Sequence, residues 1–322
     1  MVGERTMRTM NIARKSFAGI ALSLALLGMS TTASAAGAGL DASVLPKATQ
    51  QELRTEIEKA RAATPELFKA VADVAARAKE LEAGARARGI PLTMHFKPLG
   101  NRALYPLIDA LVFDSHAPAD LPPIAASALR LGLIEAVGSI RDARAIPVLA
   151  KLLELGRDDK TVRASSEALA RIGTDDALTL LTTAVALATP DSDRERAILA
   201  GMHDARRESA AHFLAKRLEQ TPDGETARVI VKSLGGVGNS WAWKTLSDQR
   251  EASATRAIAA NALVDAYVRF GGEVREQAAK AILVVDDAST PTLIAQARKG
   301  ASTDIAAALD ALDRRFAANP IR

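Results

Sequence analysis

Apolar residues recur along the chain at helical spacing, and the whole pattern returns after about 32 residues. The stretch RIGTDDALTLL at 171–181 matches SIRDARAIPVL at 139–149 in residue type, with Ile172 aligned on Ile140. The final leucine of the stretch has counterparts at spacings of 32, 33 and 32 residues: Leu149, Leu181, Leu214 and Leu246. A fixed period of this length is typical of a chain built from stacked copies of one small unit.

Each unit is predicted to be a helix, a tight turn and a second helix. In the segment 162–172 the apolar residues fall on one helical face. Gly173 suits the left-handed position that ends a helix, and the acidic pair Asp175 and Asp176 follows where a short acid can cap the next helix. One helix pair cannot bury its apolar face alone, so consecutive pairs must stack.

Two segments before the repeats are predicted to be amphipathic helices, 48–61 and 65–86. Thr64 supplies a capping hydroxyl for the second helix, and Pro65 occupies its first position. Such helices suit a cap on the open end of a stack, because terminal repeats need covering. A dimer through these helices is the alternative. The segment 89–101, which contains Gly and Pro, is predicted to be a linker.

The regular spacing is interrupted once within the repeats. Leu246 and Leu293 are 47 residues apart, about one and a half units. This spacing predicts an extra helix at about 253–270. We accordingly divide the chain after residue 35 into an N-terminal helical cap region with its linker, 36–104, and a repeat array, 105–322.

The clearest copy has small, apolar and charged residues at fixed positions: Val162, Arg163, Ala164, Glu167, Ala168, Leu169, Ile172, Gly173, Asp175 and Ala177. A similar set returns at 274–288, and the third copy departs from it at His203 and Asp204. These residues resemble the motif of HEAT repeats, in the subtype named after phycobilisome lyases. The resemblance covers roughly 122–300. It implies an all-α fold, an α-solenoid of stacked helix pairs in a HEAT-like superhelix, here preceded by an N-terminal helical hairpin.

The start of the chain has the features of an export signal. Uncharged residues fill the 13-residue stretch 17–29, and 33–35 forms the A-x-A pattern of a cleavage site. The stretch is shorter than the roughly 20 residues that span a membrane. We expect a signal peptide at 1–35 and a periplasmic or secreted protein without stable membrane insertion. An uncleaved anchor is the alternative, because uncharged residues continue to Leu40.

The export signal changes the meaning of the charge balance. The whole chain has a formal net charge of +4, but the four basic residues and one acidic residue of 1–35 account for +3 of it. The remaining chain is therefore nearly neutral, at about +1, and the electrostatic case for nucleic-acid binding disappears. Aromatic residues make up only 3% of the chain, which leaves few stacking platforms for a polysaccharide. The 322 residues contain no cysteine, which excludes thiolate chemistry.

No constellation typical of catalysis or metal binding is visible. The four histidines lack H-x-x-x-H and H-E-x-x-H spacing. His116 lies near Asp114 and Asp120, but in a proline-broken loop, which favours a solvated cluster. The glycines at 234–241 lack the lysine of a phosphate-binding loop and are assigned to a turn. We expect no catalytic residue, no metal and no cofactor, although enzymatic activity stays an open question.

Recognition is expected at the turns, because the apolar positions are committed to stacking. The candidate contact residues lie in turns that differ between copies: Trp241, Arg206, Arg207, Arg141, Asp175 and Asp176. Trp241 aligns with an exposed turn position, although packing on the next repeat is its alternative interpretation. Trp243 aligns with the core position Leu178. The competing site is the basic run around Arg88 and Lys97.

We therefore interpret the chain as a non-catalytic scaffold or adaptor of the cell envelope that binds another protein. The subtype resemblance implies an alternative, a lyase-like enzyme or cofactor chaperone related to phycobilin lyases. Those lyases attach bilins to cysteines of partner proteins in the cytoplasm, and an export signal argues against that role. The partner itself has no signature in the sequence.

Overall fold

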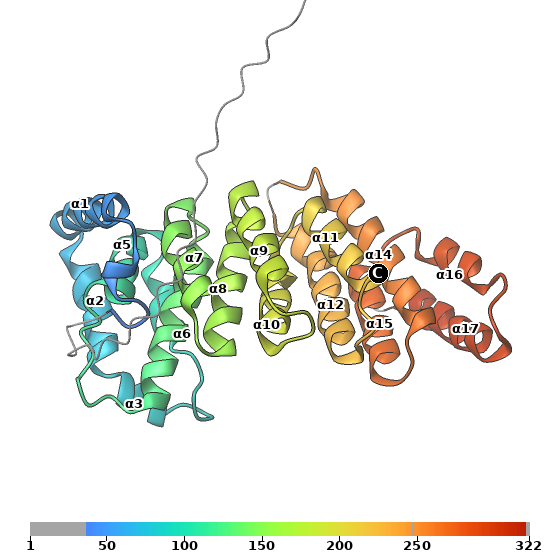
Figure 1. The fold of residues 1–322 in the computed structure, drawn as a ribbon, viewed down its shortest axis with the longest axis horizontal. Coiled ribbons are helices and arrows are strands. Elements are labelled where there is room, and N and C mark those ends of the chain that lie inside the picture. The colour runs from blue at the N-terminus through green and yellow to red at the C-terminus, as the bar shows by residue number, and fades with distance from the viewer. Residues whose placement is uncertain (1–36, 247, 320–322) are drawn as a thin grey trace, which may run out of the picture. The chain divides into compact units, whose positions relative to one another are not determined.

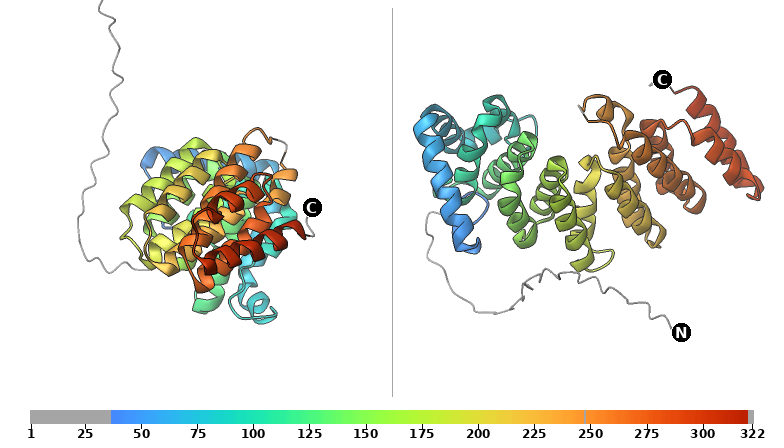
Figure 2. Two further views of the ribbon diagram at one scale, coloured as in Figure 1. Left: turned by 90° about the vertical axis from the view of Figure 1, so that its right-hand side faces the viewer. Right: turned by 90° about the horizontal axis from the view of Figure 1, so that it is seen from above.

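The computed structural model describes residues 37–246 and 248–319. Over these two ranges the regular secondary structure is helical, without strands. The predicted signal peptide at 1–35 lies outside the described residues. The fold is the expected all-α solenoid, in which helix pairs follow one another along the stack in chain order (Figure 1 and Figure 2).

The first helix predicted before the repeats is present, whereas the second, predicted at 65–86, is divided at Arg77 into two helices. The elements of this region are η1 (Ala42–Val44), α1 (Lys47–Ala63), α2 (Pro65–Ala76), α3 (Ala78–Ala83), α4 (Thr93–Phe96), η2 (Lys97–Leu99), η3 (Asn101–Ala103) and α5 (Leu104–Val112). Helices α1 and α2 meet at Thr64 and both pack on α5. The apolar stripe of α1, Leu53 and Ile57, is buried within the chain. The hairpin therefore continues the hydrophobic core of the stack.

The segment 89–101, predicted to be a linker, is folded and packed. Phe96 in α4 is only 1% exposed. The backbone N–H of Leu92 donates a hydrogen bond to the carbonyl of Ala128 over 3.0 Å, which ties the segment to the first long helix of the array. Gly and Pro serve here in short helical turns. The presence of Gly and Pro in a sequence does not by itself distinguish such turns from a flexible linker.

The array consists of helix pairs whose first helices form one layer. Its elements are α6 (Pro123–Ile140), η4 (Ala143–Ala145), α7 (Ile146–Leu155), α8 (Asp159–Ile172), α9 (Asp175–Leu187), α10 (Asp193–Gly201), η5 (Met202–Asp204), α11 (Glu208–Glu219), α12 (Gly224–Val237), α13 (Ser240–Lys244), α14 (Ala252–Arg269), α15 (Gly272–Val285), α16 (Thr290–Arg298) and α17 (Thr303–Ala317). Contacts run from α6 to α8, α10, α12 and α15 in turn. The second helices cover the other side of this layer.

The fourth repeat corrects the sequence alignment. Its second helix, α13, ends at Lys244, so Leu246 lies beyond the helix and is only half-buried. Leu149, Leu181 and Leu214 are fully buried, at 0% exposure. The extra helix predicted at 253–270 is confirmed as α14, and it packs on both α11 and α12. Helix α14 therefore fills the second-layer place that the repeat period assigned to α13.

The first helices approach one another closely because small residues line their contact. A Cβ atom on Gly138 in α6 would lie 2.6 Å from the Cβ of Ala168 in α8. Buried serines add hydrogen bonds across the layer. The hydroxyl of Ser166 donates to the carbonyl of Ile198 over 2.7 Å, and that of Ser233 to the carbonyl of Leu199 over 2.8 Å. Both bonds join neighbouring first helices directly.

Helix α6 is the one described helix whose length and composition would also suit a membrane span. More than half of that stretch, 56%, is buried inside the protein. Its buried residues contact α5 on one side and α8 on the other. The apolar character of α6 is thus used in the core of the stack.

We expect Leu181→Ala to lower the free energy of unfolding by about 2–5 kcal/mol, the usual cost of truncating a fully buried leucine. Leu246→Ala should cost much less, because that side chain is half-buried outside a helix. Urea unfolding followed by circular dichroism at 222 nm measures both variants. Equal losses would show that the fourth repeat has been assigned wrongly.

Candidate binding surface

The turns between first and second helices are shaped by residues in the left-handed backbone region. Gly173 ends α8 with φ of +67°, as the sequence predicts, and Arg141 ends α6 at the equivalent position with φ of +60°. The cap of α9 is the hydroxyl of Thr174, which accepts a hydrogen bond from the N–H of Ala177. Asp175 opens the first turn of α9, where its charge complements the helix dipole.

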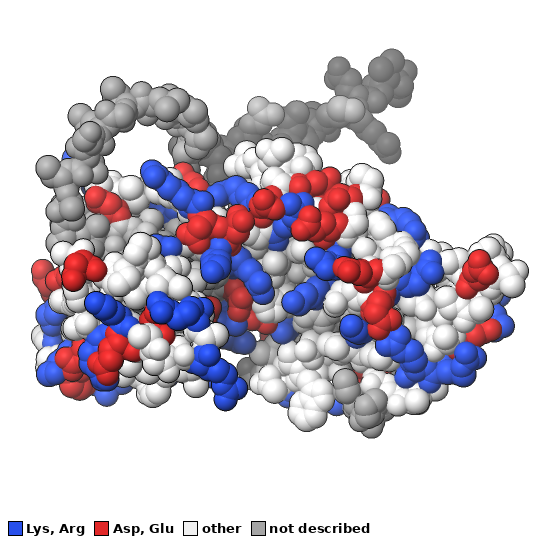
Figure 3. Space-filling view, turned by 90° about the horizontal axis from the view of Figure 1, so that it is seen from below, with Lys and Arg blue, Asp and Glu red and all other residues white. Residues whose placement is uncertain are grey.

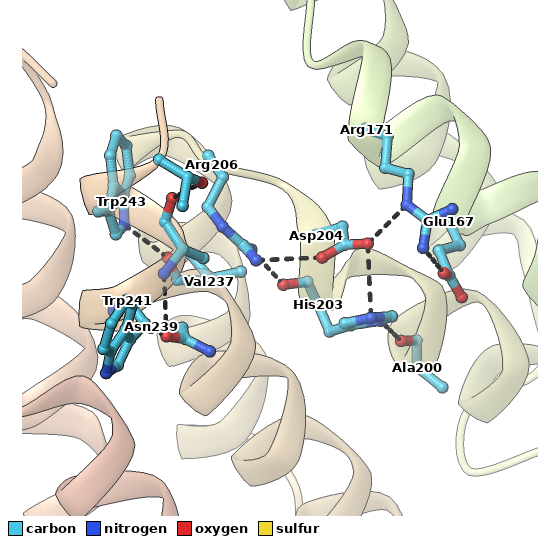
Figure 4. A network of polar contacts seen from close by, with 12 residues as sticks. Glu167, Arg171, Ala200, His203, Asp204, Arg206, Val237, Asn239, Trp241 and Trp243 are labelled. Carbon is cyan, nitrogen blue, oxygen red and sulfur yellow. Dashed lines mark hydrogen bonds and ion pairs between the residues drawn. The ribbon is translucent and has the colours of Figure 1, made fainter. Parts of the chain in front are cut away.

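An ion-pair network joins the second and third repeats at these turns (Figure 4). Arg171 in α8 pairs with Glu167 on its own helix, and its Nε donates to Asp204 over 2.7 Å. Asp204 also accepts from Arg206 over 3.0 Å, while Arg206 donates to the carbonyl of His203 over 2.6 Å. One carboxylate therefore serves two guanidinium groups from different repeats.

The pKa shifts in this network follow from burial and from neighbouring charges. Burial raises the pKa of Asp204, but His203 and Arg171 outweigh it, so that pKa lies below its ordinary value of 3.8. Burial and repulsion from Arg141 lower the pKa of the Arg206 guanidinium despite its ion pair with Asp204. Arg141 therefore lies close enough to Arg206 to repel it.

Arg207 connects three segments of chain. It donates to the carbonyl of Gly173 over 2.8 Å and to Asp175 over 2.7 Å. Its Nε donates to Glu251 over 3.1 Å, and the N–H of Glu208 at the start of α11 donates to the same carboxylate over 2.7 Å. Arg207 thus holds the loop before α14 against the turn of the second repeat.

These turns surround a pocket of about 340 Å³. Five arginines and three carboxylates line it: Arg141, Arg171, Arg206, Arg207, Arg250, Asp204, Asp248 and Glu251. The apolar part of the lining comes from Ala170, Ile172, Trp243 and Leu246. Each of these arginines except Arg141 has a carboxylate partner within the described part of the chain. The side chain of Arg141 is exposed and makes no hydrogen bond or ion pair there.

The predicted contact residues fall into two groups. Trp241 is 62% exposed and lies over Lys244, whose Nζ is 5.6 Å from the ring centroid. Asp176 is also exposed. Arg206, by contrast, has a side chain only 13% exposed, and Arg207 is held by its three partners, so both arginines stabilise the turns. The expected core role of Trp243 is confirmed, because it is 3% exposed and its Nε1 donates to the carbonyl of Val237 over 2.9 Å.

The competing basic site lies elsewhere. Arg88 follows α3 and pairs with the buried carboxylate of Glu82 over 2.7 Å. Lys97 is exposed in η2, close to the first long helix α6. Neither residue lines the pocket. On the face shown in Figure 3, basic and acidic side chains are interspersed along the array.

One group of side chains has the geometry of a metal site, which sequence spacing did not show. Glu167, His203 and Asp204 offer ligand atoms within 4.8 Å of one another. Nδ1 of His203 must carry a proton, since it lies 2.9 Å from the carbonyl of Ala200, a pure acceptor. Arg171, however, already pairs with both carboxylates. Arg206 also pairs with Asp204, so the two carboxylates are already balanced by two arginines of the chain itself.

Sequence reasoning placed Asp204 in a turn of this surface but missed Arg171 and Glu251 as members of it. Arg171 directly precedes the Ile172–Gly173 turn, so its position could have been noted. Glu251 lies in the insertion before α14, where no period applies. Its contact with Arg207 joins residues 44 positions apart.

Comparison with known families supports the repeat interpretation. Residues 125–201, which run from α6 through α10, match the family described as HEAT repeats. A comparison with curated protein sequences found no match. The match and the helix-pair stack together support a HEAT-repeat protein, a class of structure that suits protein-binding scaffolds.

The lowered pKa of Asp204 predicts how its contribution to stability depends on pH. A carboxylate whose pKa is lower in the folded state than in the unfolded state stabilises the fold. This contribution is fully present at pH values above the unfolded-state pKa, about 3.8, and is lost as the pH falls through the folded-state pKa. We expect Asp204→Asn to lower stability at pH 7, and the difference from wild type to shrink below about pH 4. Urea unfolding between pH 7 and pH 3 measures this. Asp176→Asn is the control. If the difference in unfolding free energy between wild type and Asp204→Asn did not depend on pH, the assignment would be contradicted.

Proposed function

We propose that this protein is a non-catalytic, exported scaffold of the cell envelope that captures another protein on its turn surface. The turn surface comprises Arg141, Asp176, Trp241 and the pocket beside them. The observation that carries the proposal is Trp241, a large aromatic side chain left 62% exposed on a short helix at the turns. Tryptophan is enriched among residues that dominate binding energy at protein interfaces.

The backbone that carries Trp241 is held in place by hydrogen bonds, which favours binding. The side chain of Asn239 accepts hydrogen bonds from the backbone N–H groups of Trp241 and Ala242, over 3.0 and 3.1 Å. The hydroxyl of Ser240 donates to the carbonyl of Val284 over 3.2 Å and anchors α13 to α15. A preorganised aromatic anchor loses little conformational freedom when a partner covers it.

Export is the part of the proposal that rests on sequence. The basic start, the apolar stretch 17–29 and the A-x-A pattern at 33–35 support it. The finer resemblance to phycobilisome-lyase repeats implies a cytoplasmic lyase or cofactor chaperone. Among the described residues, no arrangement of side chains supports that alternative. A scaffold accounts for both the repeats and the signal. The proposed ligand of the scaffold is another protein. The proposal involves neither a nucleic acid nor a cofactor.

The export proposal predicts a mature N-terminus close to Ala36. N-terminal sequencing of the protein recovered from the periplasm or the medium should therefore start near this residue. The proposal fails if soluble cytoplasmic protein retains residues 10–30.

The capture proposal predicts position-dependent crosslinking. A photo-crosslinking amino acid at position 241 should yield a discrete adduct in the source cells. The matched control is position 187, because Leu187 is 79% exposed but ends α9 at the opposite end from the turn. Trp241→Ala should then weaken binding of the purified partner at least tenfold, as expected for an interface anchor. Equal adducts at both positions would refute the turn surface, and adducts only near Arg88 and Lys97 would place binding at the competing basic site.

A further inference from the structure

Arg141 occupies a backbone position that disfavours it. Its φ of +60° and ψ of +34° are left-handed, a conformation that is unfavourable for a residue with a Cβ atom. The equivalent position in the next repeat is Gly173, which adopts the same region without that cost. The arginine side chain is exposed and makes no stabilising contact within the described chain. Fold stability thus gives no reason for arginine here.

Among the described residues that line the pocket, Arg141 is the arginine whose charge is unmatched. Arg171 pairs with both Glu167 and Asp204, and Arg206 also pairs with Asp204, so these two guanidinium groups are matched by two carboxylates. Arg250 pairs with Asp248, and Arg207 pairs with Asp175 and Glu251. Arg141 adds a further guanidinium close enough to Arg206 to lower that group's pKa. An anion placed between Arg141 and Arg206 would relieve this repulsion.

The chain itself shows how this pocket binds a carboxylate. Glu251 enters it from the loop before α14 and is held by the Arg207 guanidinium and by the N–H of Glu208. Charge-assisted bonds of this kind are about twice as strong as neutral ones. The half of the pocket around Arg207 is therefore filled by the chain's own acid. In the half around Arg141, Asp204 pairs with Arg206, whereas the guanidinium of Arg141 has no carboxylate partner among the described residues.

The remaining lining indicates that the ligand has an apolar part. Ile172, Trp243 and Leu246 border the pocket beside the arginines. A bare inorganic anion would leave these surfaces in water, whereas an acidic residue flanked by an apolar one would cover them. The volume of about 340 Å³ is at the low end of ligand pockets and suits one or two residues.

We propose that the pocket at Arg141 binds a peptide carboxylate of the partner protein through the Arg141 guanidinium, beside Arg206, with an adjacent apolar side chain against Ile172 and Leu246. The inference rests on the proposed scaffold function and names the chemistry that the scaffold recognises. The carboxylate has two sources, an acidic side chain within the partner or the carboxyl group at its C-terminus.

Fluorescein-labelled pentapeptides test this in fluorescence anisotropy with the folded full-length protein. One peptide has an internal Glu between leucines and an amidated end, the second has Gln there and a free C-terminus, and the third has Gln and an amidated end. We expect one or both carboxylate peptides to bind and the third not to bind. The peptide that binds identifies the source of the carboxylate. Binding should weaken as salt screens the charges.

Arg141→Asn removes the charge and keeps a residue that tolerates the left-handed conformation. It should weaken binding about tenfold, equivalent to about 1.4 kcal/mol. Arg141→Gly, which also removes the strain, should bind as weakly while unfolding no more easily than wild type. Arg86→Asn is the matched control, an exposed arginine outside the pocket, and should leave binding unchanged.

Several results would overturn the inference. It fails if no carboxylate peptide binds, if the third peptide binds equally well, or if Arg141→Asn has no effect. Displacement of the peptide by millimolar phosphate as efficiently as by unlabelled peptide would show a general anion site instead. If peptide binding fails while crosslinking at position 241 still captures a partner, the scaffold function stands and only the pocket assignment is wrong.

Discussion

The close packing of successive first helices is the constraint on which the structure depends. Gly138 leaves no room for a side chain against Ala168, and Ser166 bonds directly to the carbonyl of Ile198. Small residues at these contacts fix both the distance between neighbouring repeats and their rotation, since a larger side chain would push the helices apart. Because the turns follow directly from the ends of these helices, the same contacts bring turn residues of successive repeats within hydrogen-bonding distance. The pocket and its ion pairs are consequences of that spacing.

Many of the arginines in this fold bind backbone rather than partners. A helix leaves its last four carbonyls without intrahelical partners, and a guanidinium from the next repeat can satisfy several at once. Arg194 donates to the carbonyls of Leu153 and Gly156 at the C-terminal end of α7, over 2.6 and 2.9 Å. Arg256 does the same at Val285, and Arg207 at Gly173. This explains why arginines in the turns are a poor guide to recognition by themselves. Arg141 differs because its side chain binds no carbonyl or carboxylate within 37–246 and 248–319.

The sequence period was sufficient to predict the helix pairs, the burial of Leu181 and the core position of Trp243, because stacking repeats the same environment at each copy. It failed at the fourth repeat. Because of the insertion after Trp243, α13 is short and α14 occupies the second-layer position instead. No local sequence pattern indicates such an exchange. The Arg171–Asp204 and Arg207–Glu251 contacts also could not be predicted from the sequence, because they depend on the rotation between repeats. Long-range geometry of that kind is set by the packing of side chains such as Gly138 and Ala168.

The distribution of charge decides what kind of recognition this surface supports. Acidic and basic side chains alternate over the array, so long-range attraction contributes little beyond a Debye length of about 8 Å in physiological salt (Figure 3). Affinity must then come from short-range contacts at particular residues. Trp241 provides an exposed aromatic side chain at the turns, and Arg141 provides a guanidinium without a hydrogen-bond or ion-pair partner among the described residues. An apolar anchor and a single unmatched charge select for the order of residues in a partner, whereas a uniformly basic surface would accept any acidic molecule.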